Sequence, residues 1–251
     1  MFRIKMEDAK LWKNLVSAIS TLIDEVGFNA TPDGIELRAM DPSHVAMVDF
    51  YWPKIAFDEY ECDRTTKVAF NVKEMLKLLR RVKGDEDLEL TLDEKSGKIV
   101  IKIKGKYLRI FNIAVLDITS EEVPTPKISF NTKVKLTTEN LREAIEDAAL
   151  VSDNIKLESS PGKLTFRASG DTGSAVIEMD KESAALLDIE VKENSKSTFS
   201  LNYLSNIVRE ASSISEIVTM EFSNNMPVRL DFELLQQGKL SYYVAPRIET
   251  E

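Results

Sequence analysis

Few residues of this chain have the type and spacing that catalysis requires. The single histidine, His44, follows Asp41 and precedes Asp49, so it could act as a general base or bind a metal with either carboxylate. A lone histidine in a turn is more often a surface or binding residue. The chain contains no phosphate loop of the GxxxxGK[ST] or GxGxxG type, no HExxH and no CxxC. The sequence therefore favours a protein that is not an enzyme.

Metal and redox chemistry are also weakly represented. The acidic runs Asp85-Glu86-Asp87 and Glu121-Glu122 could bind a cation, although loop carboxylates are usually solvated charge. The one cysteine, Cys62, has no histidine nearby in sequence, and we expect a partly buried thiol. A single cysteine excludes a disulfide within the chain and favours a reducing, intracellular setting. We predict no metal and no cofactor.

Positive charge is concentrated in one segment of a chain whose net charge is −9. The segment 71–83 has an apolar stripe at helical spacing, and its other face carries five cations and Glu74. Cations spaced along a helix neutralise phosphates without reading base sequence, whereas the alternative is a solvated helix face. An earlier helical segment adds two lysines, and a later one adds Arg209 at the position equivalent to Arg80. The predicted DNA-binding residues are Lys10, Lys13, Lys73, Lys77, Arg80, Arg81 and Arg209.

An internal repeat organises the elements that carry these residues. Residues 70–80 (FNVKEMLKLLR) align with 199–209 (FSLNYLSNIVR), and 99–103 (IVIKI) align with 228–232 (VRLDF) at the same offset of 129. Residues 35–39 (IELRA) also align with 164–168 (LTFRA). Between the halves lies a segment with two prolines, which predicts an extended connector. We therefore divide the chain into domain 1 (1–116), connector (117–127) and domain 2 (128–251).

Periodicity predicts the same order of elements in each half. We expect a helix from Ala9 to about Glu25, capped by Asp8 and stopped at Gly27, and a second helix over 71–82. The second half should hold a helix capped by Thr138 and another capped by Ser200. Short alternating strands separate the helices, at 2–6, 26–30, 34–40, 46–52, 88–92, 99–103, 107–115, 134–136, 155–158, 163–168, 174–179, 217–222, 228–234 and 240–245. The fold class is α+β: two similar β-rich domains, each with two helices packed on its sheets.

The sequence resembles the proliferating cell nuclear antigen family of sliding clamps, of the archaeal and eukaryotic type, over essentially its whole length. The resemblance is carried by 37–45 (LRAMDPSHV), the proline-containing connector, 225–228 (NMPV) and the ending 242–249 (YYVAPRIE). It implies a DNA clamp fold assembled as a ring of three subunits around duplex DNA, with no activity of its own. Such a ring is a processivity factor for DNA replication and repair.

The resemblance also implies partners and sites. Expected clients are DNA polymerase, the clamp loader, flap endonuclease and DNA ligase, which dock short peptides beneath the connector. The matching peptide-binding positions are Met40, His44, Val45, Met47, Val123, Pro227, Tyr243, Ala245, Pro246 and Ile248. Val123 stands where the family often has a larger aliphatic residue. The location would be cytoplasmic and nucleoid-associated in an archaeon, or nuclear in a eukaryote.

Ring closure by the family's route would pair a strand within 107–116 of one subunit with one within 171–179 of the next, since exposed sheet edges require partners. The implied subunit interface residues are Tyr107, Arg109, Phe111, Ile113, Ser174, Val176, Ile177 and Met179. A homotrimer and a heterotrimer remain open, as does a relative specialised for checkpoint signalling. A metal-dependent nuclease with scattered carboxylates is the alternative of another class. No run of about 18 apolar residues predicts a membrane span, and Met1-Phe2-Arg3 opens into a strand pattern rather than a signal peptide.

Overall fold

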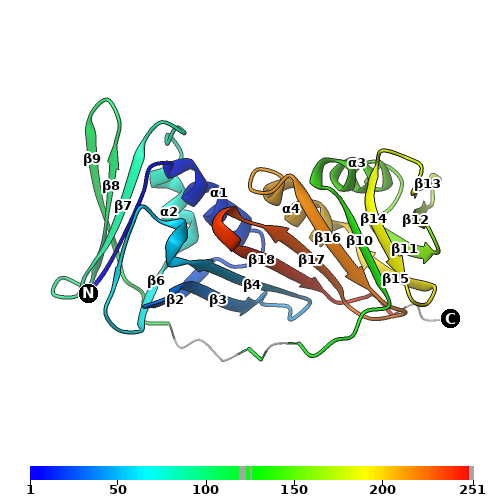
Figure 1. Cartoon of the computed structure of the whole chain (residues 1–251), viewed down its shortest axis with the longest axis horizontal. Coiled ribbons are helices and arrows are strands. Elements are labelled where there is room, and N and C mark those ends of the chain that lie inside the picture. The colour runs from blue at the N-terminus through cyan, green and yellow to red at the C-terminus, as the bar shows by residue number, and fades with distance from the viewer. Residues whose placement is uncertain (119–122, 125, 249–251) are drawn as a thin grey trace. The chain divides into compact units, whose positions relative to one another are not determined.

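The computed structural model describes residues 1–118, 123–124 and 126–248, and these fall into two compact units. Unit 1 consists of Met1–Pro42, Val48–Val123 and Leu234–Leu240. Unit 2 consists of Ser43–Met47, Pro124–Glu233 and Ser241–Glu251. Within the described residues each unit has two α-helices and otherwise antiparallel strands (Figure 1). The predicted α+β class with two similar units is thereby confirmed.

Unit 1 contains two sheets and the helices α1 (Ala9–Ile19) and α2 (Val72–Leu79), which pack on each other. One sheet has the order β5-β1-β7-β8-β9, which leaves β9 at an edge. The other runs in the order β4-β3-β2-β6. The strands are β1 (Phe2–Met6), β2 (Glu25–Thr31), β3 (Gly34–Met40), β4 (Ala46–Pro53), β5 (Glu59–Cys62), β6 (Thr66–Asn71), β7 (Asp87–Asp93), β8 (Lys98–Lys104) and β9 (Leu108–Ala114), with short 3-10 turns η1 (Lys54–Ala56) and η2 (Leu235–Gln237).

Unit 2 repeats this plan with α3 (Thr138–Ala149) and α4 (Leu201–Ala211), which also pack on each other (Figure 1). Its four-stranded sheet has the order β13-β12-β11-β15, so β13 is an edge strand. Its other sheet runs β14-β10-β16-β17-β18. The strands are β10 (Thr132–Thr137), β11 (Asn154–Ser160), β12 (Lys163–Gly170), β13 (Gly173–Asp180), β14 (Leu186–Val191), β15 (Ser195–Ser200), β16 (Ile217–Phe222), β17 (Val228–Glu233) and β18 (Lys239–Val244).

Aromatic side chains fill the core of unit 1 beneath its helices. Trp12 of α1 lies 5.6 Å from Phe28 of β2, and Phe28 lies 5.8 Å from both Phe50 and Phe70, measured between ring centroids. All four side chains are almost completely buried. Burial of a large apolar side chain stabilises a fold by about 1.5–3 kcal/mol, so this cluster fixes α1 on its sheet. The polar face of α1 is thereby turned to solvent.

Several predicted boundaries were wrong. The first helix ends at Ile19 rather than near Glu25, and Gly27 lies inside β2, because Glu25 onward pairs with β6. At the end of this helix, the hydroxyls of Ser20 and Thr21 donate hydrogen bonds to the backbone carbonyls of Ser17 and Ala18. The second helix covers 72–79 rather than 71–82.

The cap assignments were partly right. Asp8 accepts a backbone N–H group at the start of α1, as predicted, and Asn71 does the same at the start of α2. The cap of α3 is Thr137, whose hydroxyl accepts from Asn140, and Thr138 is instead the first helical residue. Ser200 occupies the cap position of α4, but its side chain makes no capping hydrogen bond.

Candidate DNA-binding and partner-binding surfaces

The helix pair α1–α2 brings six of the seven predicted DNA-binding residues together in unit 1. The backbone N–H of Ala9 donates to the carbonyl of Glu86, 2.8 Å away, which ties the start of α1 to the loop after α2. A Cβ placed on Gly84 would lie 3.9 Å from the Cδ atom of Lys10, so the Lys10 side chain runs beside that loop. The cations at the start of α1 and the end of α2 therefore form one surface.

Most of this cationic face has no acidic partner within the part of the chain that the structure describes. Lys10, Lys77, Arg80 and Arg81 are exposed and Lys13 is half-buried. These five make no ion pair with the described residues, whereas the ammonium of Lys73 lies 2.8 Å from Asp24. Cations without partners on a helix face are available to phosphate groups.

The helix pair α3–α4 has a different charge. On α3, Arg142 forms ion pairs with Glu139 and with Glu146, the latter 2.6 Å away. The Arg142 guanidinium holds the pKa of Glu139 below its usual value. On α4, Arg209 donates to Asn206 at 3.1 Å and lies 3.4 Å from the Glu210 carboxylate. The seventh predicted residue, Arg209, thus lies in unit 2 and is already engaged.

The two carboxylates that the sequence places near His44 have different surroundings. Asp41 is buried, and Asp49 receives two hydrogen bonds from Arg38 at 3.1 and 3.2 Å. Among the described residues no three His, Cys, Asp or Glu side chains are placed to hold a metal. Glu121 and Glu122 lie outside the described residues.

Two further titratable groups have structural partners. Burial raises the pKa of Glu86, but the backbone N–H of Lys83 and the Arg109 guanidinium outweigh it, so the net pKa lies below the usual value. The Arg109–Glu86 distance is 2.5 Å. The Cys62 thiol donates to the carbonyl of Arg64, and burial raises the pKa of this thiol, which disfavours the reactive thiolate.

Eight of the ten predicted peptide-binding residues belong to unit 2. The backbone N–H of Ala245 donates to the carbonyl of Val45, 2.8 Å away, so the segment 43–47 lies against the end of β18. His44 is exposed and adopts a left-handed backbone conformation with φ 56°. Met47 and Tyr243 are buried, whereas Ile248 is 90% exposed. The others of this group are Pro227 and Pro246, both half-buried.

The remaining two peptide candidates belong to unit 1. Met40 ends β3 and is half-buried, and Val123 lies at the edge of the connector's undescribed part. The carbonyl of Val123 accepts from the Nη1 atom of Arg38 at 3.4 Å. Because Asp49 holds the same guanidinium, Arg38 fixes Val123 relative to β3 and β4. Sequence reasoning missed this role, which no local pattern signals.

The predicted interface strands β9 and β13 are edge strands, and their side chains differ widely in exposure. On β9, Ile113 is only 8% exposed, whereas Leu108 and Ile110 are 56% and 52% exposed. On β13, Met179 is buried and Val176 is 51% exposed. Alternation along a strand explains the pattern, since Arg109, Phe111 and Ile113 share the face opposite Leu108 and Ile110. The strand alternation could have identified Leu108 and Ile110 from sequence. Tyr107 and Ser174 are exposed, and Ile177 is half-buried.

A hollow of about 510 Å³ beside β9 also escaped sequence reasoning. It lies between the loop after α2 and the β8–β9 turn, two segments that β7 and β8 separate in the chain. Its lining is rich in both signs of charge: Arg81, Lys83, Asp85, Glu86, Asp87, Lys104, Gly105, Lys106, Tyr107 and Arg109.

Comparison with known families covers both halves of the chain. Residues 1–121 match the N-terminal domain of proliferating cell nuclear antigen, and residues 124–247 match its C-terminal domain. A DNA polymerase sliding clamp from Thermofilum pendens is 34% identical over 249 residues, which cover 99% of this chain and 100% of that protein. DNA polymerase sliding clamp 1 from Pyrobaculum aerophilum is 38% identical over 242 residues, which cover 96% of each chain.

Solved structures agree with these relatives. PCNA from Thermococcus kodakaraensis superimposes with a TM-score of 0.93 at 28% identity, covering 98% of this chain and 100% of that one. A chain of a PCNA2–PCNA3 complex from Sulfolobus tokodaii gives 0.91 at 29% identity, with coverage of 98% and 100%. Both domains of the family match this chain in tandem, and relatives more than 30% identical match it over nearly its full length. The chain belongs to the proliferating cell nuclear antigen family.

Proposed function

We propose that this protein is a DNA sliding clamp, a ring-shaped processivity factor that encircles duplex DNA. One observation carries the proposal: the chain is similar over nearly its full length to proteins named DNA polymerase sliding clamp. The cationic α1–α2 face, in a chain of net charge −9, supports it independently. An acidic protein with one basic face attracts DNA there and repels it elsewhere.

Assembly into a ring would join the edge strands β9 and β13 of neighbouring subunits. Each strand lacks a partner on one side within the described residues, and each exposes apolar side chains, Leu108 and Ile110 on β9 and Val176 on β13. Pairing the edges would satisfy their backbone groups and bury these side chains. We propose a homotrimer. The Sulfolobus tokodaii structure contains two different PCNA chains, which keeps a heterotrimer as the second possibility.

The DNA contact would use the predicted cations of the helices, and the partner contact would use the ten predicted apolar and rim residues. The clients would be DNA polymerase, clamp loader, flap endonuclease and DNA ligase, docked through peptides, and the protein itself would have no catalytic activity. We propose the domain division 1–116, 117–127 and 128–251, supported by the family matches that end at 121 and begin at 124.

A cytoplasmic location with DNA association is proposed because the relatives named above are archaeal proteins. No helix among the described residues is long and apolar enough to cross a membrane.

Retention on circular DNA tests the clamp function. The protein, loaded by its clamp loader onto a nicked circular plasmid, should remain bound through gel filtration and should be lost after the circle is cut once. A clamp held by topology slides off ends, whereas a protein held by affinity does not. Equal retention on circular and linear DNA would contradict the proposal.

A further inference from the structure

We propose that, within each subunit, only the α1–α2 pair of unit 1 attracts duplex DNA, and that the α3–α4 pair of unit 2 repels it. The proposal deepens the proposed function and rests on it, because it concerns which part of an encircling ring touches DNA. It also removes Arg209 from the set of DNA-binding residues that the sequence predicts. The two pairs are repeats of one another, so their different charges are the basis of the argument.

The α1–α2 pair is strongly cationic. Its two helices carry four lysines and a single carboxylate, Glu74, and two arginines follow directly at 80 and 81. Lys73 is the only one of these six cations that has an ion pair with the described residues. A phosphate approaching this surface displaces no carboxylate from the other five. The gain from releasing DNA counterions is therefore retained in full.

The α3 helix carries the opposite charge on its exposed face. Glu139, Glu143, Glu146 and Asp147 are all exposed, and the spacing 139, 143 and 147 places three of these carboxylates on one stripe of the helix. The helix's only cation, Arg142, is held by Glu139 and Glu146. Glu143 and Asp147 have no cationic partner among the described residues. A DNA phosphate brought to this stripe would meet like charge.

The α4 helix supplies no compensating charge. Its only cation, Arg209, is matched by Glu210 and bonded to Asn206, so a phosphate would have to compete with both. Its other polar side chains that reach the surface are neutral: Asn202 is exposed, and Ser205 and Asn206 are half-buried. The α3–α4 pair as a whole has two cations and five carboxylates. Its charge is therefore negative, where that of α1–α2 is positive.

The internal repeat offers a matched test, because Arg80 and Arg209 occupy equivalent positions in the two halves. The intact ring is titrated with a fluorescent duplex of about 30 base pairs at several salt concentrations. Each lost phosphate contact should lower affinity about eightfold at 0.1 M salt and reduce the salt slope by about 0.9. Arg80→Gln should show this loss, and Arg209→Gln should match the unmodified ring. Glu143→Gln should bind more tightly.

The proposal is overturned if Arg209→Gln loses as much affinity as Arg80→Gln, or if Glu143→Gln leaves the affinity unchanged. All three side chains are exposed, so the variants should fold, and light scattering confirms that each ring has the unmodified mass. Retention of the unmodified ring on closed circles separates the two proposals. If the ring stays on circles but the variants behave contrary to expectation, only the division between helix pairs fails.

Discussion

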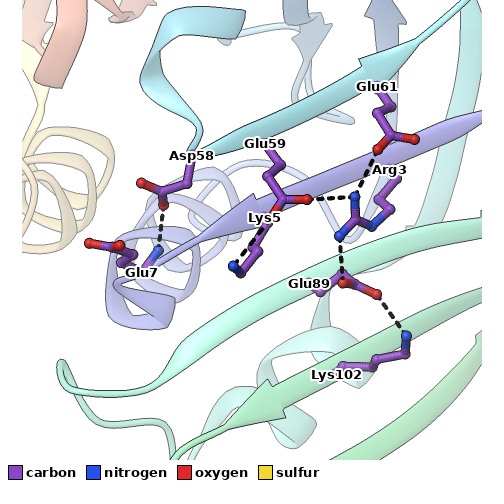
Figure 2. Close-up of polar contacts among 8 residues, drawn as sticks. All are labelled: Arg3, Lys5, Glu7, Asp58, Glu59, Glu61, Glu89 and Lys102. Atoms are coloured by element: carbon purple, nitrogen blue, oxygen red, sulfur yellow. Dashed lines mark hydrogen bonds and ion pairs between the residues drawn. The ribbon is translucent and has the colours of Figure 1, made fainter.

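The guanidinium of Arg3 lies 3.0 Å from the carboxylate of Glu89, across the paired strands β1 and β7 (Figure 2). Both side chains are about four-fifths buried. The same guanidinium reaches Glu59 at 2.7 Å and Glu61 at 2.8 Å, and Glu89 also accepts from Lys102 at 2.7 Å. Arg3 therefore connects three strands of one sheet through charge-assisted hydrogen bonds.

This network predicts sensitivity to acid. The pKa of Glu89 lies below its usual value, because hydrogen bonds from Lys102 and Arg3 outweigh the opposing effect of burial. A carboxyl whose folded pKa is depressed stabilises the fold above its unfolded pKa of about 4.3, and this stability is lost as pH falls through the folded pKa. Arg3→Met should therefore cost about 1 kcal/mol in urea unfolding at pH 7 and clearly less at pH 3.

Glu89→Gln serves as the control for this prediction. In a double-mutant cycle, the pair should show a coupling free energy at pH 7 that decreases as the pH falls below the unfolded carboxyl pKa of about 4.3. Zero coupling at pH 7 would mean that the Arg3–Glu89 contact adds nothing to stability.

The turn before β13 provides a second prediction. A Cβ on Gly170 would lie 1.9 Å from the carbonyl oxygen of Val151, whereas one on Gly173 would make only an ordinary contact, 3.6 Å from a Val151 methyl. Gly170→Ala should therefore destabilise the protein by about 1–3 kcal/mol through forced backbone movement. Gly173→Ala, three residues away in the same turn, should be close to neutral. Thermal unfolding of both variants tests this difference. Equal melting temperatures would show that the backbone near Gly170 moves aside at no cost and would contradict the prediction.

The helices and the repeated order of elements could be predicted from sequence. The exact ends of helices and several strands could not, because they depend on pairing between distant segments. The four helices and the repeat follow from apolar spacing, but the strands β5, β6, β14 and β15 were not assigned. β15 reads SKSTFS, and its buried positions are mostly serines, so no apolar alternation marks it. The end of α1 likewise depended on pairing between β2 and β6, residues about 40 apart, which a local window does not contain.

For the candidate surfaces, the sequence could indicate which side chains are exposed, but it could not indicate which side chains contact each other. Lys77 and Arg80 could be placed on an exposed face from helical period alone. The ion pair of Lys73 with Asp24 could not, because it joins two segments about 50 residues apart. The role of Arg38 depends in the same way on Asp49 and on the carbonyl of Val123.

A third prediction concerns the exposed edge of β9. Ile110 is 52% exposed on this strand, and Ile55 is 60% exposed on η1 of the same unit. Ile110→Asp would place a charge in the proposed pairing with β13 and should shift the assembly towards monomers, since burying an unpaired carboxylate is costly. Ile55→Asp is the matched control and should leave the assembly intact. Light scattering measures the mass, and an unchanged mass for Ile110→Asp would place the subunit interface elsewhere.

The last prediction concerns peptide docking at the end of β18. Pro246 lies between two anchored residues: the N–H of Ala245 donates to Val45, and the N–H of Arg247 donates to the carbonyl of Thr198 at 2.7 Å. Proline has no N–H, so Pro246→Asp removes neither hydrogen bond, and the variant should keep its backbone. A Gln-x-x-Leu-x-x-Phe-Phe peptide would bury an aliphatic and two aromatic side chains here. The free energy gained by this burial is offset by the entropy cost of ordering the peptide, so we expect roughly micromolar affinity.

Calorimetry with this peptide should show that Pro246→Asp weakens binding by at least about tenfold, because the new carboxylate would lose water without gaining a partner. Met40→Arg should weaken binding in the same way. Leu187→Asp is the matched control: Leu187 is 50% exposed on β14 of unit 2 and is not among the docking candidates, so its replacement should leave peptide affinity unchanged. Undiminished binding by both Pro246→Asp and Met40→Arg, in rings of normal mass, would place the partner site on another surface of the clamp.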